Sequence, residues 1–122
     1  MIHSGRMKVE VRKAGGVPVL APDGRVTIGA PSRALKAAIE AELQQGAAAL
    51  IVDGSRVEYL DSSGLGELIA AARTLSERGG RLGVCSPSPK LKEILEITGL
   101  SIVFLVGDDE QSVAAALTPA MR

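Results

Sequence analysis

The sequence predicts a single α/β domain: a mixed sheet of four or five strands with the helices mainly on one face. Strand-like stretches come first along the chain and are followed by alternating helical and strand-like ones, an order typical of a mixed sheet with right-handed helical crossovers. Apolar residues make up 46% of the chain but aromatics only 2%, which leaves Val, Ile, Leu and Ala to build the core. A length of 122 residues suits one compact domain. We expect this domain to span residues 7–118, because the patternless residues 1–6 read as a disordered or cloning-derived fringe.

The N-terminal part of the chain predicts a β-hairpin. Residues 7–12 and 17–20 have strand patterns, and an Ala-Gly-Gly turn at residues 14–16 separates them. Pro22-Asp23-Gly24 predicts a second turn, after which residues 25–28 continue in extended form.

The rest of the chain predicts helices and strands in alternation. Pro31-Ser32 opens a helix whose apolar residues recur at three- and four-residue spacing until Gly46. The unbroken apolar run at residues 48–52 predicts a central strand covered on both faces. The helix that begins near Gly64 is expected to follow that strand directly through a polar loop. The further segments expected are a helix over residues 65–75, a strand over 82–85, a helix around 91–95, a strand over 102–106 and a final helix capped by Asp108 or Asp109.

Charge and cysteine content narrow the function classes. Fourteen basic residues balance fourteen acidic ones, so no general field attracts nucleic acid or an anionic membrane. The lone Cys85 cannot form an internal disulfide and is predicted to be a small buried core residue, and no apolar run approaches the ~20 residues of a membrane span. Because the start also lacks a signal peptide's apolar core, we expect a cytoplasmic protein without membrane insertion, either a monomer or a weak dimer.

The stretch VEYLDSSGLGEL, residues 57–68, joins a strand-like segment to a helical one through Asp61, two serines and two glycines. Serine hydrolysis needs a histidine base, but the one histidine, His3, lies in the patternless start, and neither serine sits in a G-x-S-x-G motif. A phosphate-binding P-loop needs a lysine, and none occurs between Lys36 and Lys90. The nearby carboxylates have no spaced His or Cys partners for a metal ion. We therefore expect no enzyme, no cofactor and no metal site.

The same stretch carries more capping residues than a helix needs. Asp61, Ser62 and Ser63 are all good N-cap residues, so one of them is expected to cap the helix. A cap takes only one such side chain, which leaves at least one serine hydroxyl free at an exposed helix N-terminus. A kinase could reach that hydroxyl, and the pattern alone leaves both serines open as acceptors.

Several stretches of the chain are similar to one known family. The most specific are Leu-Ile-Val-Asp at residues 50–53, Val57, and Tyr-Leu-Asp-Ser-Ser-Gly-Leu-Gly at residues 59–66. Arg-Gly-Gly-Arg-Leu at residues 78–82 and Leu-Glu-Ile-Thr-Gly-Leu at residues 95–100 add further matches. On these residues nearly the whole chain resembles the STAS family, whose fold is shared by bacterial anti-sigma factor antagonists and the cytoplasmic domains of sulfate transporters.

This resemblance implies a function and a site. In the antagonist branch, the serine just before Gly-Leu-Gly is phosphorylated by the partner anti-sigma factor, itself a serine kinase, and here that serine is Ser63. The unphosphorylated protein would bind the kinase and free a sigma factor, and a PP2C-type serine phosphatase would reset the switch. Some STAS proteins are instead structural or regulatory subunits of membrane transport complexes, and this alternative stays open. The surface expected to contact the partner comprises Asp23, Gly24, Asp61, Ser62, Ser63, Gly64, Leu65 and Gly66.

Overall fold

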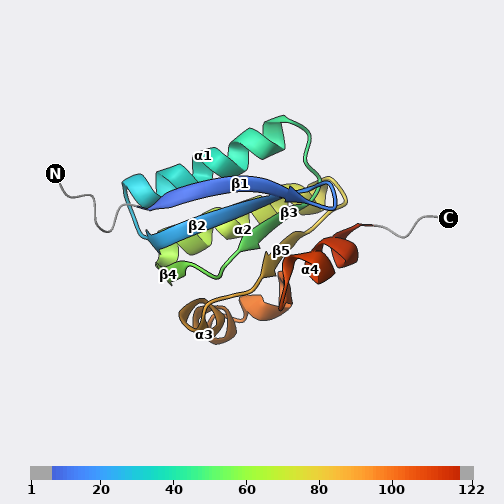
Figure 1. The fold of residues 1–122 in the computed structure, drawn as a ribbon. Helices are drawn as coiled ribbons and strands as arrows, with labels where there is room; N and C mark the ends of the chain where they lie inside the picture. The colour runs from blue at the N-terminus through green and yellow to red at the C-terminus, as the bar shows by residue number, and fades with distance from the viewer. Residues whose placement is uncertain (1–6, 119–122) are drawn as a thin grey trace.

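The computed structural model describes residues 7–118, which form one α/β domain with a six-stranded mixed sheet (Figure 1). The predicted fringe, residues 1–6, lies outside the described residues. Within the described part of the chain, no helix has both the length and the apolar character needed to cross a bilayer. The elements in chain order are β1 (Lys8–Ala14), β2 (Val17–Val26), α1 (Ala30–Gln44), β3 (Leu50–Asp53), β4 (Val57–Leu60), α2 (Ser62–Glu77), β5 (Leu82–Cys85), α3 (Pro89–Ile97), the short 3-10 helix η1 (Leu100–Ile102), β6 (Leu105–Gly107) and α4 (Glu110–Leu117).

The sheet runs in the order β1-β2-β3-β5-β6, and β4 lies beside the second half of β2. β1 and β2 form the predicted antiparallel hairpin, whereas the other neighbouring pairs are parallel. The mixed sheet is thus confirmed, but it has six strands and not the predicted four or five. The additional strand is β4, which forms between β3 and α2, so the helix does not follow the central strand directly.

The predicted turn at Pro22-Asp23-Gly24 is wrong, because β2 runs through these residues without interruption. β2 pairs with β3 up to Leu20 and with β4 from Gly24 onward, so Pro22 lies between the two stretches. Neither parallel neighbour therefore requires the N–H group that proline lacks. The register shifts between Gly24 and Arg25, and the φ of 124° at Gly24 is one that glycine adopts readily.

The strand predicted over residues 102–106 is shorter than expected. Gly99 ends α3 in a left-handed conformation with a φ of 75°, and the chain then forms the 3-10 helix η1. β6 begins only at Leu105, directly after Phe104, whose side chain is buried in the core. Apolar residues at 102 and 103 therefore lie exposed on a turn and not in the sheet.

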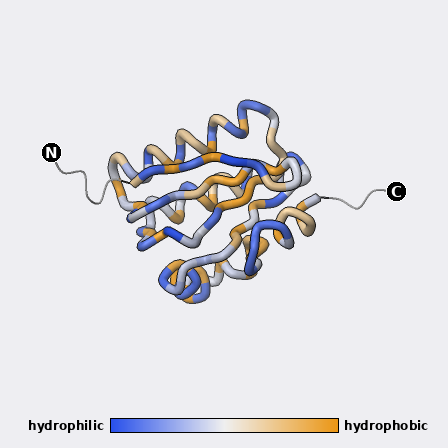
Figure 2. Tube along the Cα trace, in the orientation of Figure 1, coloured by the Kyte–Doolittle hydropathy of each residue, from blue (hydrophilic) through white to orange (hydrophobic). Residues whose placement is uncertain are grey.

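Two buried clusters cover the two faces of the sheet. The larger one contains side chains of α1, α2 and α3, and the smaller one contains Val113 and Ala114 of α4. Along β3 the side chains alternate between the clusters, since Leu50 and Val52 join the larger one and Ile51 the smaller one. Most of the helices thus lie on one face, as predicted, and the central strands form the most hydrophobic part of the chain trace (Figure 2). The smaller cluster also holds Cys85, which is confirmed as a buried core residue.

Candidate functional site

The candidate site lies where β4 ends and α2 begins. Asp61 is the N-cap of α2: its backbone is extended, and its Oδ1 accepts hydrogen bonds from the backbone N–H groups of Ser63 at 2.9 Å and Gly64 at 3.1 Å. These bonds satisfy donors that the first turn of a helix leaves without an intrahelical partner. Because Asp61 is the cap, neither serine hydroxyl is needed for that purpose.

The carboxylate of Asp61 also binds two groups outside the cap. The hydroxyl of Ser63 donates to Oδ1 at 2.8 Å, and the backbone N–H of Ile28 donates to Oδ2 at 2.9 Å. The hydrogen bond from the Gly64 N–H, followed by those from the Ser63 hydroxyl and the Ile28 N–H, lowers the pKa of Asp61 below its ordinary value. Asp61 is therefore ionised at neutral pH and holds the Ser63 hydroxyl with its proton toward the carboxylate.

The two serines differ in their surroundings. Ser63 is partly buried, and its hydroxyl is oriented by Asp61. Ser62 is exposed, and no hydrogen bond within residues 7–118 orients its hydroxyl. Of the two hydroxyls, that of Ser63 is the one whose direction a hydrogen bond within residues 7–118 fixes.

The two glycines of the Gly-Leu-Gly sequence differ in how closely other atoms approach them. A Cβ on Gly64 would lie 2.7 Å from the carbonyl oxygen of Val26 and 2.7 Å from Cδ1 of Leu60, so only glycine lets α2 approach the ends of β2 and β4 this closely. A Cβ on Gly66 would meet no atom within 4 Å, so that glycine leaves open surface one turn after Ser62. Leu65, between them, packs against the larger buried cluster.

The structure brings residues 61–66 together but places Asp23 and Gly24 elsewhere. Asp23 is exposed and lies 3.6 Å from the guanidinium of Arg56, and the buried Gly24 donates its N–H to the carbonyl of Arg56 at 3.0 Å. Both residues belong to β2 and lie beside the start of β4, roughly 10 Å along the strand from Asp61. Within residues 7–118, no hydrogen bond or ion pair joins either of them to residues 61–66.

Ile28 also belongs to this site, although its place in the sequence predicted no role for it. Its side chain is 78% exposed, and its N–H is bound to Asp61. A signal for this was present, since Ile28 directly precedes Gly29, the N-cap of α1. A hydrophobic residue at that position often packs against the fourth helical residue, but here that residue is Arg33. Ile28 therefore has no apolar partner at that position.

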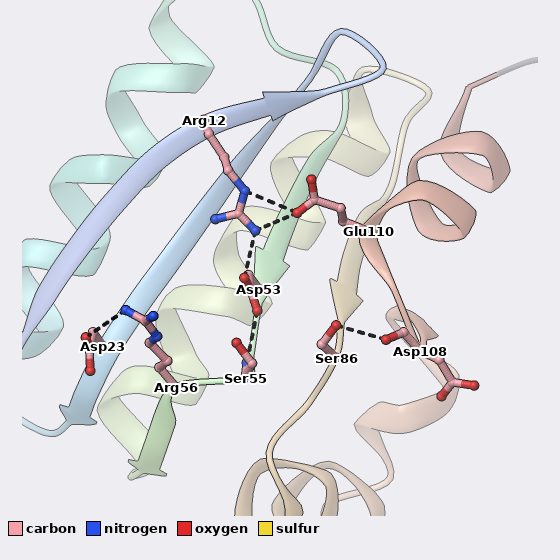
Figure 3. A network of polar contacts seen from close by, with 8 residues as sticks. All are labelled: Arg12, Asp23, Asp53, Ser55, Arg56, Ser86, Asp108 and Glu110. Atoms are coloured by element: carbon pink, nitrogen blue, oxygen red, sulfur yellow. Dashed lines mark hydrogen bonds and ion pairs between the residues drawn. The ribbon is translucent and has the colours of Figure 1, made fainter.

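A separate polar network lies on the α4 face of the sheet (Figure 3). Arg12 of β1 bonds Asp53 at 2.7 Å and also pairs with Glu110, which ties the first turn of α4 to β1 and β3. Burial raises the pKa of Asp53, but hydrogen bonds from Arg12 and Ser55 outweigh it and hold the pKa below its ordinary value. The single guanidinium of Arg12 links carboxylates from two other elements of the fold, which fits a structural role. The polar side chains lining the adjacent pocket of about 150 Å³ are Glu10, Arg12, Asp23, Asp53, Ser55 and Arg56.

The Asp61 carboxylate should make the stability of the domain depend on pH. Its folded-state pKa lies below the ordinary value of 3.8, so its stabilising effect is present above that value and is lost as the pH falls through the folded-state pKa. Asp61→Asn keeps a capping side chain but lacks the charge. Unfolding followed from pH 7 to 2.5 should show the wild type more stable than Asp61→Asn at neutral pH, with the difference shrinking below about pH 4. A difference that is independent of pH would contradict the proposed role of the charge.

The two glycines should respond in opposite ways to the same substitution. Gly64→Ala forces a Cβ into Leu60 and the Val26 carbonyl and should destabilise the domain by about 1–3 kcal/mol. Gly66→Ala places a methyl group in open space and should stabilise it by about 0.5–1 kcal/mol, because alanine favours the helix. Urea unfolding of both variants measures this, and an equal loss of stability for both would show that the close approach at Gly64 is not specific.

A family model and several known proteins match this chain. Residues 9–107 match the family model described as Mlab, STAS domain. The provisionally named anti-sigma factor antagonist BtrV of Bordetella bronchiseptica is 29% identical over 94% of this chain and 98% of its own length. The anti-sigma-B factor antagonist of Listeria monocytogenes is 33% identical over 62% of this chain and 67% of its own.

A solved structure shows the same fold over nearly the full length. The crystal structure of an anti-sigma factor antagonist from Mycobacterium paratuberculosis superposes with a TM-score of 0.82 and 26% identity, covering 96% of this chain and 98% of that one. The family model and these relatives confirm the resemblance predicted from the sequence. The chain belongs to the STAS domain family.

Proposed function

We propose that the protein is an anti-sigma factor antagonist: a non-enzymatic binding switch that sequesters a kinase-type anti-sigma factor and is released when Ser63 is phosphorylated. The observation that carries the proposal is the Ser63 hydroxyl, which Asp61 orients at 2.8 Å although the helix does not need it as a cap. The names of the similar proteins support the same class of function. Such a switch would act in the cytoplasm, where ATP and sigma factors occur, and a PP2C-type phosphatase would reset it.

The geometry suits Ser63 as a phosphoryl acceptor. Its O–H points at the ionised Asp61, so the lone pairs of its oxygen face away from the carboxylate and are free to attack a γ-phosphoryl group. In the transfer, the Ser63 oxygen bonds to the γ-phosphorus of ATP, ADP leaves, and Asp61 lies where it can accept the hydroxyl proton. Enzymes accelerate phosphoryl transfer mainly by positioning and electrostatic stabilisation, so an oriented acceptor with a weak base beside it is adequate.

The phosphate would change the surface more than the fold. It adds roughly −1.5 to −2 charges beside the Asp61 carboxylate, and the Ser63 oxygen can no longer donate a hydrogen bond. The N–H groups and the dipole at the start of α2 offset part of this repulsion, so the domain should stay folded. A partner pressed against the same surface would have to desolvate two neighbouring anions, which favours its release.

A second candidate function is a structural or regulatory subunit of a membrane transport complex. The observation in its favour is a group of exposed apolar residues on α3 and the following turn: Ile97 at 77%, Ile102 at 86% and Val103 at 52%. A switch that works through Ser63 does not require this surface. Affinity capture with the full chain, with ATP or with ADP, separates the two functions, since recovery of a transport ATPase in place of a serine kinase would favour the transport role.

Substitutions at Ser63 should separate folding from signalling. Ser63→Ala loses one hydrogen bond to Asp61 and should cost no more than about 1 kcal/mol of stability. It should bind the kinase persistently even with ATP, whereas Ser63→Asp should stay folded but bind at least about tenfold more weakly, a difference of about 1.4 kcal/mol. Thermal unfolding and calorimetric titration of both variants with the kinase test this.

Ser62→Ala is the matched control, because it removes a neighbouring hydroxyl that Asp61 does not orient. It should bind the kinase, become phosphorylated and be released like the wild type. Wild-type affinity for both Ser63 variants, with Ser63→Ala still released by ATP, would refute the switch at Ser63.

A further inference from the structure

An exposed apolar side chain lies beside the proposed acceptor. Ile28 is 78% exposed, and its backbone N–H shares the Asp61 carboxylate with the Ser63 hydroxyl, each group on a different oxygen. The backbone of Ile28 and the proposed acceptor hydroxyl are therefore bound to the same carboxylate. A protein whose active centre reaches the Ser63 oxygen therefore comes close to Ile28.

The backbone around Ile28 is held from both sides. The carbonyl of Thr27 accepts the N–H of Ser32 at 3.0 Å, and the carbonyl of Gly29 accepts the Ser32 hydroxyl at 3.2 Å and the N–H of Arg33 at 3.1 Å. Gly29 itself has a φ of 102°, which fixes the turn into α1. Isoleucine is also stiff at χ1 because it is β-branched. The backbone that carries the side chain is thus held in place, which reduces the conformational freedom lost on binding.

The exposed face of α2 that begins at Ser62 carries uncharged residues. Ser62, Gly66 and Ile69 follow at four- and three-residue spacing, so they share one face of α2. Ser62 and Gly66 are exposed, and the Ile69 side chain is 37% exposed. This face of α2 is uncharged, so beside the ionised Asp61 carboxylate it adds no charge that a partner would have to desolvate.

We propose that Ile28 is a specificity-determining docking residue that inserts into an apolar pocket of the kinase-type anti-sigma factor beside its nucleotide site. The proposal rests on the proposed function. Sequestration requires a complex that persists while Ser63 is unphosphorylated, and an exposed apolar side chain on a well-held backbone next to the acceptor supplies lasting contact. A phosphatase needs only a transient encounter with this site, and a second copy of the chain would cover the acceptor, so the kinase is the occupant that fits.

The test compares Ile28→Ser with Ile102→Ser, which removes an equally exposed isoleucine, 86% accessible, on η1. Each anti-sigma factor serine kinase of the source organism, purified with ADP, is titrated with the wild type and both variants. Ile28→Ser should weaken binding to the cognate kinase at least about tenfold, and Ile102→Ser should stay within about twofold of the wild type. Both variants should melt like the wild type, because neither side chain is buried.

A kinetic measurement with ATP distinguishes docking from disturbance of the acceptor. Ile28→Ser keeps the backbone N–H that binds Asp61, so the Ser63 hydroxyl stays oriented. The KM of the kinase for the antagonist should therefore rise about tenfold while kcat is unchanged.

Three results would overturn the inference while leaving the proposed function intact. They are unchanged affinity of Ile28→Ser, an equal loss for Ile102→Ser, and a fall in kcat alone. An Ile28→Ser variant that binds the kinase normally but is dephosphorylated slowly by a PP2C-type phosphatase would make the phosphatase the occupant and would also overturn it. If no kinase binds the wild-type chain, the proposed function fails, and this inference fails with it.

Discussion

The candidate site depends on one carboxylate. Asp61 accepts four hydrogen bonds: two from the backbone of the first turn of α2, one from the Ser63 hydroxyl and one from the Ile28 N–H. The last of these links residues 33 positions apart, so the side chain that caps α2 also fixes the segment that leads into α1. Removing Asp61 would therefore loosen the helix start, the Ser63 hydroxyl and the backbone at Ile28 at once.

The packing beneath this carboxylate is equally specific. Gly64 lets α2 approach the Val26 carbonyl and Leu60, and the N–H of Asp61 donates to that same carbonyl at 3.2 Å. The end of β2 thus contacts both the capping residue and the first turn of α2. Because the packing is close here, we expect a chemical change at Ser63 to alter the surface more than the core.

Local patterns predicted much of this arrangement. The hairpin followed from alternation, α1 and α2 followed from apolar spacing, and the central strand followed from an unbroken apolar run. The set of capping residues was also visible, although the choice among them was not, because all three are good caps in isolation. Asp61 is the cap in the structure because its carboxylate reaches N–H groups on two segments.

The features that were missed depend on contacts between distant segments. Pro22 reads as a turn residue in the sequence, yet β2 passes through it, because β2 changes neighbour from β3 to β4 at that point. Ile28 reads as part of a strand, yet it ends up exposed, since the strand ends at Val26 and the position that would cover it holds Arg33. The exposure of Ile28 had a local signal in its position before the N-cap Gly29, whereas the course of β2 through Pro22 depends on strands distant in the sequence.

The most direct test of the account is site-resolved mass spectrometry of the chain after incubation with its kinase and ATP, performed on the wild type and on Asp61→Asn. If Asp61 orients the acceptor, phosphate should appear on Ser63 and not on Ser62 or Ser55, and the substitution should slow its appearance. Phosphate on Ser62 or Ser55 in place of Ser63, or an unchanged rate in Asp61→Asn, would contradict the central claim.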